Sequence, residues 1–218
     1  MPVITMSRQI GCGAAEVANR VAGTLRLRMF DKTLMMRVAS EVGIHENEIV
    51  DYSEEEYQAR NFFERLFSLQ RTVAEVTRTQ GISGEGQINT QILDEGRAIA
   101  LVRATMGAAY ERGNVLIIGR GGQAILEDKA DVLHVRIVSS LEDRTMRLQE
   151  RDNLTVPQAR RLVMERDRAT AEYLRTFHQI DWDDPTLYHL VVNTGRLGID
   201  EAAELIRAAA QGLPQAAS

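Results

Sequence analysis

Two glycine-bearing segments of the chain have residue types suited to binding phosphate. Ser7-Arg8-Gln9-Ile10-Gly11-Cys12-Gly13 follows one apolar run, and Gly119-Arg120-Gly121-Gly122 follows another. Glycines let the backbone approach a phosphate closely, and the N–H groups and dipole at a helix N-terminus favour an anion. A tight turn without a ligand is the alternative. The first segment is therefore a candidate phosphate loop.

This loop departs from the Walker pattern G-x-x-x-x-G-K-[ST]. Arg8 stands at its first glycine, Ala14 at its lysine and Ala15 at its Ser/Thr. The chain has 24 Arg and only two Lys, Lys32 and Lys129, and neither lies in the loop. Phosphate charge must then be met by backbone N–H groups and by arginines, and a guanidinium can fork onto phosphate.

Arginines outside the loop supply further candidate contacts. Arg120 lies between glycines at a predicted strand end, where it can fork onto a phosphate or carboxylate. Residues 142–175 carry eight arginines and seven acids, which predicts either a lid that closes on phosphates or two solvated helices with ion pairs. The lid candidates are Arg147, Arg151, Arg166 and Arg168. Arg97 and Arg103, on the preceding helix, are weaker candidates for the Arg120 pocket.

The elements that must position these residues alternate between strand and helix. Apolar runs predict strands at 2–6, 27–30, 114–118, 131–138 and 188–193, and helical spacing predicts helices at 14–25, 32–41, 90–112, 141–152, 156–177 and 199–210. Such alternation predicts an α/β fold with a parallel sheet between helices. Since ligands bind at the carboxyl ends of such strands, both glycine turns are expected on one edge.

The predicted division of the chain has three parts. The core comprises 1–44, 113–140 and 186–218, a helical acceptor-binding insert spans 45–112, and the arginine-rich lid region spans 141–185. An apolar cluster at 62–67 in the insert predicts a local core, or else a homodimer surface.

Composition excludes several classes of function. A formal net charge of −5 argues against a chain that coats nucleic acid. The single cysteine, Cys12, excludes a disulfide framework and a cysteine zinc site, and the four histidines have no ligand spacing. No signal peptide and no run of 18 apolar residues is recognised, so no membrane association and a cytoplasmic location are expected.

Six segments together resemble the cytidylate kinase-like family, within the nucleoside monophosphate kinase group of P-loop folds. They are 4–13, 30–32, 115–122, 131–138, the D-W-D-D-P segment 181–185, and 190–197. The resemblance implies a three-layer fold with insert and lid, and a nucleotide-binding transferase that moves the γ-phosphate of ATP to a nucleoside monophosphate with Mg²⁺. CMP or dCMP is the expected acceptor. A degenerate nucleotide-binding module and a kinase of another small molecule remain alternatives.

The resemblance also assigns roles to residues. The family loop tends to read S-R-x-x-G-S-G-G-R-E, so Ala14 and Ala15 replace Gly and Arg, and Cys12 replaces Ser. Donor-binding positions are Ser7, Arg8, Gly11, Cys12, Gly13, Ala14 and Glu16, with Thr194 near the adenine. Asp31 and Arg37 are implied acceptor contacts; an N-cap Asp31 and a solvated Arg37 are the alternative. In the lid motif D-x-x-R, Asp167 fits and Thr170 replaces Arg, leaving Arg166 and Arg168 as substitutes.

Overall fold

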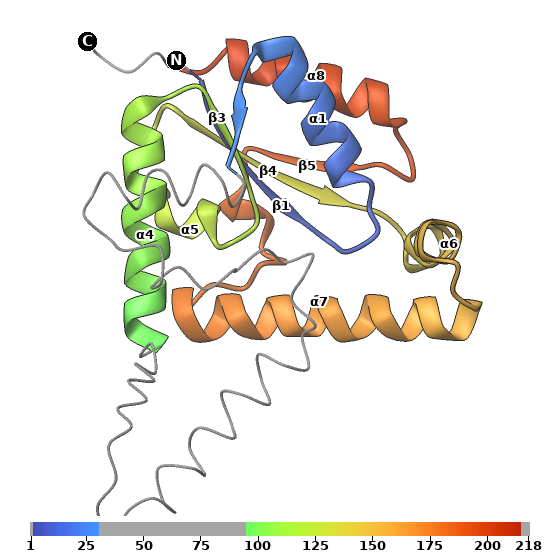
Figure 1. Cartoon of the computed structure of the whole chain (residues 1–218). Coiled ribbons are helices and arrows are strands. Elements are labelled where there is room, and N and C mark those ends of the chain that lie inside the picture. Colours follow the sequence, from blue (N-terminus) through green and yellow to red (C-terminus); the bar gives the residue numbers. More distant parts are fainter. Residues whose placement is uncertain (1, 31–94, 215–218) are drawn as a thin grey trace, which may run out of the picture.

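The sheet that carries both glycine turns is five-stranded and parallel. A computed structural model describes residues 2–30 and 95–214, without the side chains of 95–98 and 101. The strands are β1 Val3–Arg8, β2 Arg28–Met29, β3 Val115–Ile118, β4 Val132–Val138 and β5 Leu190–Asn193. Their spatial order is β2-β3-β1-β4-β5, with every neighbouring pair parallel (Figure 1). The predicted parallel α/β architecture is confirmed.

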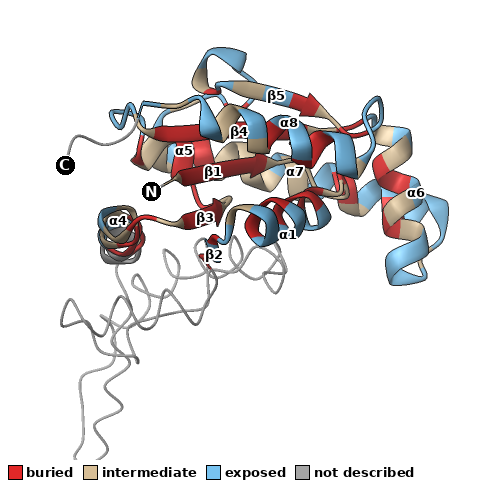
Figure 2. Ribbon diagram, turned by 90° about the horizontal axis from the view of Figure 1, so that it is seen from above, coloured by how far each residue is buried: buried red, intermediate tan, exposed pale blue. Residues whose placement is uncertain are grey.

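Helices cover both faces of the sheet, which makes three layers (Figure 2). One face carries α1 Ala14–Leu25 and α8 Ile199–Gln211, and the other carries α4 Glu95–Arg112 and the short α5 Gly122–Ile125. Beyond the carboxyl ends of the strands lies α6 Leu141–Asp152, followed by α7 Val156–His178. A 3₁₀ turn, η3 Pro185–Leu187, precedes β5.

The two faces of β1 have different partners because successive side chains on a strand point to opposite sides. Ile4 and Met6 pack in the apolar cluster with α1 and α8. Val3 packs in the cluster with α4. Thr5 and Ser7 lie on the same face as Val3 and pair in register with β4 residues His134 and Arg136. This face is therefore apolar at the start of the strands and polar near their carboxyl ends.

Helix bounds agree closely with the sequence expectations. The helices predicted at 14–25 and 141–152 have those bounds in the structure. At the start of the second helix the Ser140 side chain accepts the N–H of Asp143. Arg26 and Asn153, in left-handed conformation, are the C-caps of the two helices. The short α5 and η3 were not predicted. The helix expected at 32–41, the 62–67 cluster and most of the insert lie outside the described residues.

Candidate phosphate-binding site

The loop between β1 and α1 needs glycine at two positions. Gly11 and Gly13 both have φ of 77°, in the left-handed region. A Cβ at Gly11 would lie 2.8 Å from the carbonyl oxygen of Arg144, and one at Gly13 would lie 2.8 Å from Ile199 Cδ1. Residues with side chains would therefore clash as well as strain the backbone. The two glycines keep the loop tight against α6 and α8.

The N-terminus of α1 is open to a ligand. Its N-cap residue is Gly13, and no side chain caps the helix. A pocket of about 420 Å³ lies over this end, lined by the loop. Its other lining residues are Arg8, Ala14, Ala15, Glu16, Arg147, Leu148, Glu150 and Arg151. Uncapped N–H groups at a helix start, with guanidinium groups beside them, suit a phosphate.

Arg147 is fixed at this pocket by Thr194, the residue after β5. Its Nη1 donates to Thr194 Oγ1 at 3.2 Å and its Nη2 donates to Thr194 O at 3.0 Å. The Thr194 hydroxyl lies 2.6 Å from the carbonyl oxygen of Cys12, to which it donates. Three segments far apart in sequence, the loop, α6 and the end of β5, thus meet around one guanidinium. Arg147 and Thr194 were both predicted, and the structure brings them together.

The other predicted lid arginines are placed differently. Arg151 lines the pocket but is more than half exposed, and it forms a two-bond ion pair with its neighbour Asp152, at 2.7 and 2.9 Å. Arg166 and Arg168, on α7, are not among the residues that line the pocket, and Arg168 is exposed. Arg147 is therefore the best-placed lid arginine at the loop.

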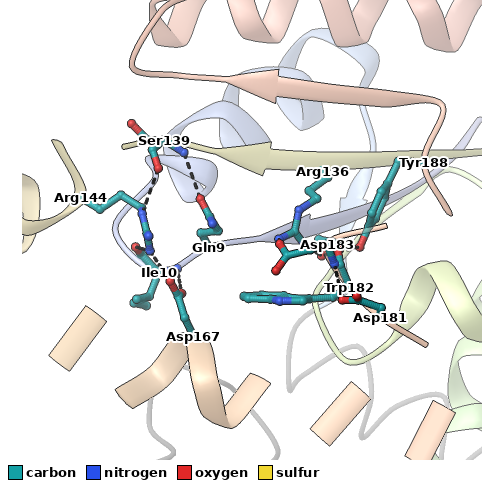
Figure 3. Close-up of polar contacts among 11 residues, drawn as sticks. Gln9, Ile10, Arg136, Ser139, Arg144, Asp167, Asp181, Trp182, Asp183 and Tyr188 are labelled. Carbon is teal, nitrogen blue, oxygen red and sulfur yellow. Dashed lines mark hydrogen bonds and ion pairs between the residues drawn. The ribbon is translucent and has the colours of Figure 1, made fainter. Parts of the chain in front are cut away.

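A largely buried ion pair between α6 and α7 anchors the loop (Figure 3). Arg144 on α6 pairs with Asp167 on α7, and the side chains are 7% and 18% exposed. The second oxygen of Asp167 accepts the backbone N–H of Ile10 at 3.1 Å, and Arg144 Nε donates to Ser139 O at 3.1 Å. Sequence reasoning singled out Asp167 as a lid residue and gave Arg144 no role. The helical phase of Arg144 with buried Leu148 was the signal that could have found it.

A second buried cluster holds the start of the loop. Arg136 on β4 pairs with Asp183, and its guanidinium lies 4.3 Å from the ring centroid of Trp182. Arg136 Nη1 also approaches Ser7 Oγ at 3.5 Å, and the hydroxyl of Tyr188, which Figure 3 shows beside Arg136, lies 3.3 Å from the same oxygen. Ser7 is therefore directed away from the pocket over α1, and the D-W-D-D-P segment fastens the chain after α7 to the sheet.

The second glycine turn lies at the neighbouring strand end, as predicted. Gly119 N donates to Met6 O at 2.9 Å, which joins the end of β3 to β1. Arg120 adopts a φ of 56°, rare for a residue with a side chain, and is only 7% exposed. Its guanidinium lies 5.5 Å from the ring centroid of Phe30. Arg120 thus lies beside Phe30, the residue after β2.

Other predicted residues are described in part or not at all. Asp31 and Arg37 lie outside the described residues, and of Arg97 only the backbone, within α4, is described. Arg103 is exposed on α4. Within the described ranges, no group of three or more His, Cys, Asp or Glu side chains is arranged to hold a metal.

Cys12 is a buried member of the loop. Burial raises the pKa of its thiol, and the backbone N–H of Ala14 and the positive charges of Arg8 and Arg144 act against this. Burial is the largest influence, so the thiol stays protonated at neutral pH. Cys12 is then a small apolar turn residue and not an activated nucleophile.

Comparison with known proteins identifies the family. The model of the cytidylate kinase-like family matches residues 3–196. The chain belongs to this family. A cytidylate kinase of Sulfurisphaera tokodaii is 33% identical over 95 aligned residues. The aligned part is 44% of this chain and covers about half, 52%, of the length of that relative. A cytidylate kinase of Pyrobaculum calidifontis is 26% identical over 94% of this chain and 90% of its own length.

A solved structure agrees with the fold of this cytidylate kinase-like chain. An uncharacterized protein from Eubacterium ventriosum has a TM-score of 0.63 at 20% identity, over 96% of this chain and 98% of that one. In the described part of the cytidylate kinase-like chain, no helix has both the length and the apolar character needed to cross a membrane.

Proposed function

We propose that the chain is a nucleoside monophosphate kinase that transfers the γ-phosphate of ATP to CMP or dCMP. The observation that carries this proposal is the network around Arg147, where Thr194 holds a guanidinium beside a glycine loop that has no lysine. Phosphoryl transfer needs mainly positioning and neutralisation of charge, and an arginine fixed at two points supplies both. The family and its cytidylate kinase members support the choice of reaction and acceptor.

The loop would hold the donor. Uncapped N–H groups at the start of α1 fit a triphosphate, and Arg8, Arg147 and Arg151 border the same pocket. Glu16, in the first turn of α1, also lines it. Mg²⁺ commonly takes only one or two carboxylates and completes its shell with substrate phosphates and water. Glu16 therefore fits a magnesium-binding role directly or through water, and bound Mg²⁺ would neutralise charge on the transferred phosphate.

The acceptor would enter beside the second glycine turn. Arg120 lies in the turn after β3, the parallel neighbour of β1. We assign Arg120 to the acceptor side, together with Asp31, Arg37, Arg97 and Arg103 as candidates from the sequence. In the proposed reaction an oxygen of the acceptor phosphate attacks the γ-phosphorus, the bond to the ADP oxygen breaks, and ADP and a nucleoside diphosphate form.

An ADP-release assay with a panel of nucleoside monophosphates tests the proposal. Arg147→Gln should lower kcat/KM for ATP by at least about tenfold, because one fixed charge-assisted contact to phosphate is lost. Arg160→Gln is the matched control: Arg160 is an exposed arginine that pairs with Glu142 at 3.6 Å. It should keep wild-type kinetics. Absence of ADP release with every monophosphate tested would contradict the kinase assignment.

A degenerate nucleotide-binding module is the second candidate. The observation that favours it is the uncharged start of α1, where Ala14 and Ala15 line the pocket in place of Walker residues. Such a module would show a rise in melting temperature with ATP but no ADP release. The same assay, run beside a thermal-shift titration, separates the two functions.

A further inference from the structure

His178, the last residue of α7, has an unexplained arrangement. Both of its ring nitrogens are buried and lack a hydrogen-bond partner in the described part of the chain. Buried polar groups are nearly always hydrogen-bonded, since an unpaired group has lost its contacts with water without gaining others. Since no described residue pairs with either nitrogen, a ligand that reaches the ring would complete its hydrogen bonds.

The ring is held at the second glycine turn. A Cβ placed on Gly121 would lie 2.5 Å from His178 Nε2, so only glycine leaves room for the imidazole. On the α7 side, the ring of Tyr173 meets the imidazole edge-on, with centroids 5.6 Å apart. Gly121 directly follows Arg120, which we place on the acceptor side. His178 thus lies against the turn that carries Arg120.

The surroundings keep the imidazole uncharged. Burial, and then the positive charge of Arg103 on α4, lower the pKa of His178 to about 4. Figure 1 shows the last turn of α7 next to α4, which agrees with this influence. At neutral pH the ring therefore offers one N–H donor and one acceptor nitrogen. The neutral imidazole lies between α4, which carries Arg103, and the turn that carries Arg120. Such a group can hydrogen-bond an uncharged part of a ligand whose phosphate is bound by the arginines.

We propose that His178 is a substrate-contact residue that hydrogen-bonds an uncharged polar group of the acceptor nucleotide, either a ribose hydroxyl or the edge of the base. This inference rests on the proposed kinase function. It adds a specificity-determining residue from the end of α7 to the proposed acceptor side, beside Gly121 and Arg103.

The test compares His178→Phe with His178→Asn in the full chain. His178→Phe should raise the KM for CMP by about tenfold, the usual value of a lost hydrogen bond to a substrate group, while the KM for ATP changes less than twofold. Its melting temperature should stay level or rise, because an unpaired polar group has been removed. His178→Asn should retain part of the affinity. Thr176→Ala, an exposed position in the same turn, is the matched control and should leave both KM values unchanged.

Acceptor panels and NMR identify the group contacted. If His178→Phe raises the KM for CMP and for dCMP equally, the contact is to the base edge. If the KM rises for CMP alone, the contact is to the ribose 2′-hydroxyl. Either rise supports the inference. In ¹⁵N spectra of the four histidines, titration with CMP in the absence of ATP should shift the His178 ring signals most. If the wild type binds CMP, but the His178 variants keep wild-type KM values and CMP does not shift the His178 ring signals, this inference is wrong and the kinase proposal stands. A wild type that neither binds nor phosphorylates any monophosphate overturns the kinase proposal and this inference with it.

Discussion

Cys12 shows how a single residue in the loop acquires its character from its position. Cys12 lies between Gly11 and Gly13, which both have left-handed backbone conformations, and its carbonyl oxygen accepts a hydrogen bond from the Thr194 hydroxyl. A helix N-terminus usually activates a cysteine, but here burial is the larger influence and raises the thiol pKa. The residue therefore stays a protonated, unreactive part of the loop between β1 and α1.

In the folded chain at pH 7.5, Cys12 should react with Ellman's reagent at least about tenfold more slowly than in urea, since both burial and the raised pKa reduce accessible thiolate. The absorbance of released thionitrobenzoate measures the rate. Cys12→Ser should show no reaction in either condition, which confirms the single thiol. Equal rates in the folded and urea-unfolded chains would contradict a buried thiol.

At the scale of elements, α6 and α7 meet through two ion pairs of different burial. Arg144 and Asp167 form the buried pair that also holds the N–H of Ile10. Glu142 and Arg160 form an exposed pair at 3.6 Å between the same helices. The two pairs permit a matched comparison, because only one of them reaches the loop.

Breaking the Arg144–Asp167 pair should lower the stability of the folded chain. Arg144→Met should lower the free energy of unfolding by about 3–5 kcal/mol, because it leaves the carboxylate of Asp167 without its charge partner. Glu142→Gln should cost at most about 1 kcal/mol. Urea unfolding measures both. Similar small losses for the two variants would show that the Arg144–Asp167 pair is not an anchor.

Substitutions at Asp167 separate its two contacts. Asp167→Asn keeps an oxygen that can accept from Ile10 N, whereas Asp167→Leu removes both the charge and the acceptor. We therefore expect Asp167→Leu to weaken ATP binding more than Asp167→Asn does, as measured by thermal-shift titration of the full chain. Equal ATP affinity of the two variants would argue that the Ile10 contact does not position the loop.

At the scale of the whole molecule, buried histidines link folding to pH. His134 on β4 contacts Thr5 Oγ1 through Nδ1 at 2.7 Å and lies 5.4 Å from the ring of His189. Burial, followed by the charge of His189, lowers the pKa of His134 to about 4. An unfolded histidine titrates near 6.5, so between these pH values the unfolded chain binds more protons than the folded chain.

The free energy of unfolding should accordingly rise with pH from about 4 to about 6.5 and lose this contribution as the solution is acidified. For His134 alone the loss between pH 7 and pH 4.5 is about 2 kcal/mol, and His178 acts in the same direction. Urea unfolding of wild type and of His134→Gln at the two pH values isolates the contribution, because other groups titrate equally in both. An identical pH dependence of the two proteins would contradict a neutral buried His134.

The sequence predicted elements better than it predicted contacts between them. Local signals sufficed for α1 and α6, whose caps and apolar spacing lie within each helix. The pairing of Asp167 with Ile10 joins residues 157 positions apart, and no local pattern encodes that. Arg147 and Thr194 were predicted as separate site residues, but their shared hydrogen bonds became visible only once β5 was placed beside β4. The short α5 was missed because it depends on the turn geometry at Gly121.

The missing lysine in the loop also affects how this chain responds to chemical labelling. Reactive ATP analogues that acylate an amine beside the phosphates find no amine in residues 9–16, and Lys129 instead lies over the ring of Tyr110, at 4.7 Å. Lysine labelling therefore has no target within the loop itself, and the other lysine of the chain, Lys32, lies outside the described residues. If the pocket binds ATP as we propose, a dicarbonyl reagent directed at guanidinium groups should modify Arg147 more slowly when ATP is present, which makes it the appropriate probe of occupancy.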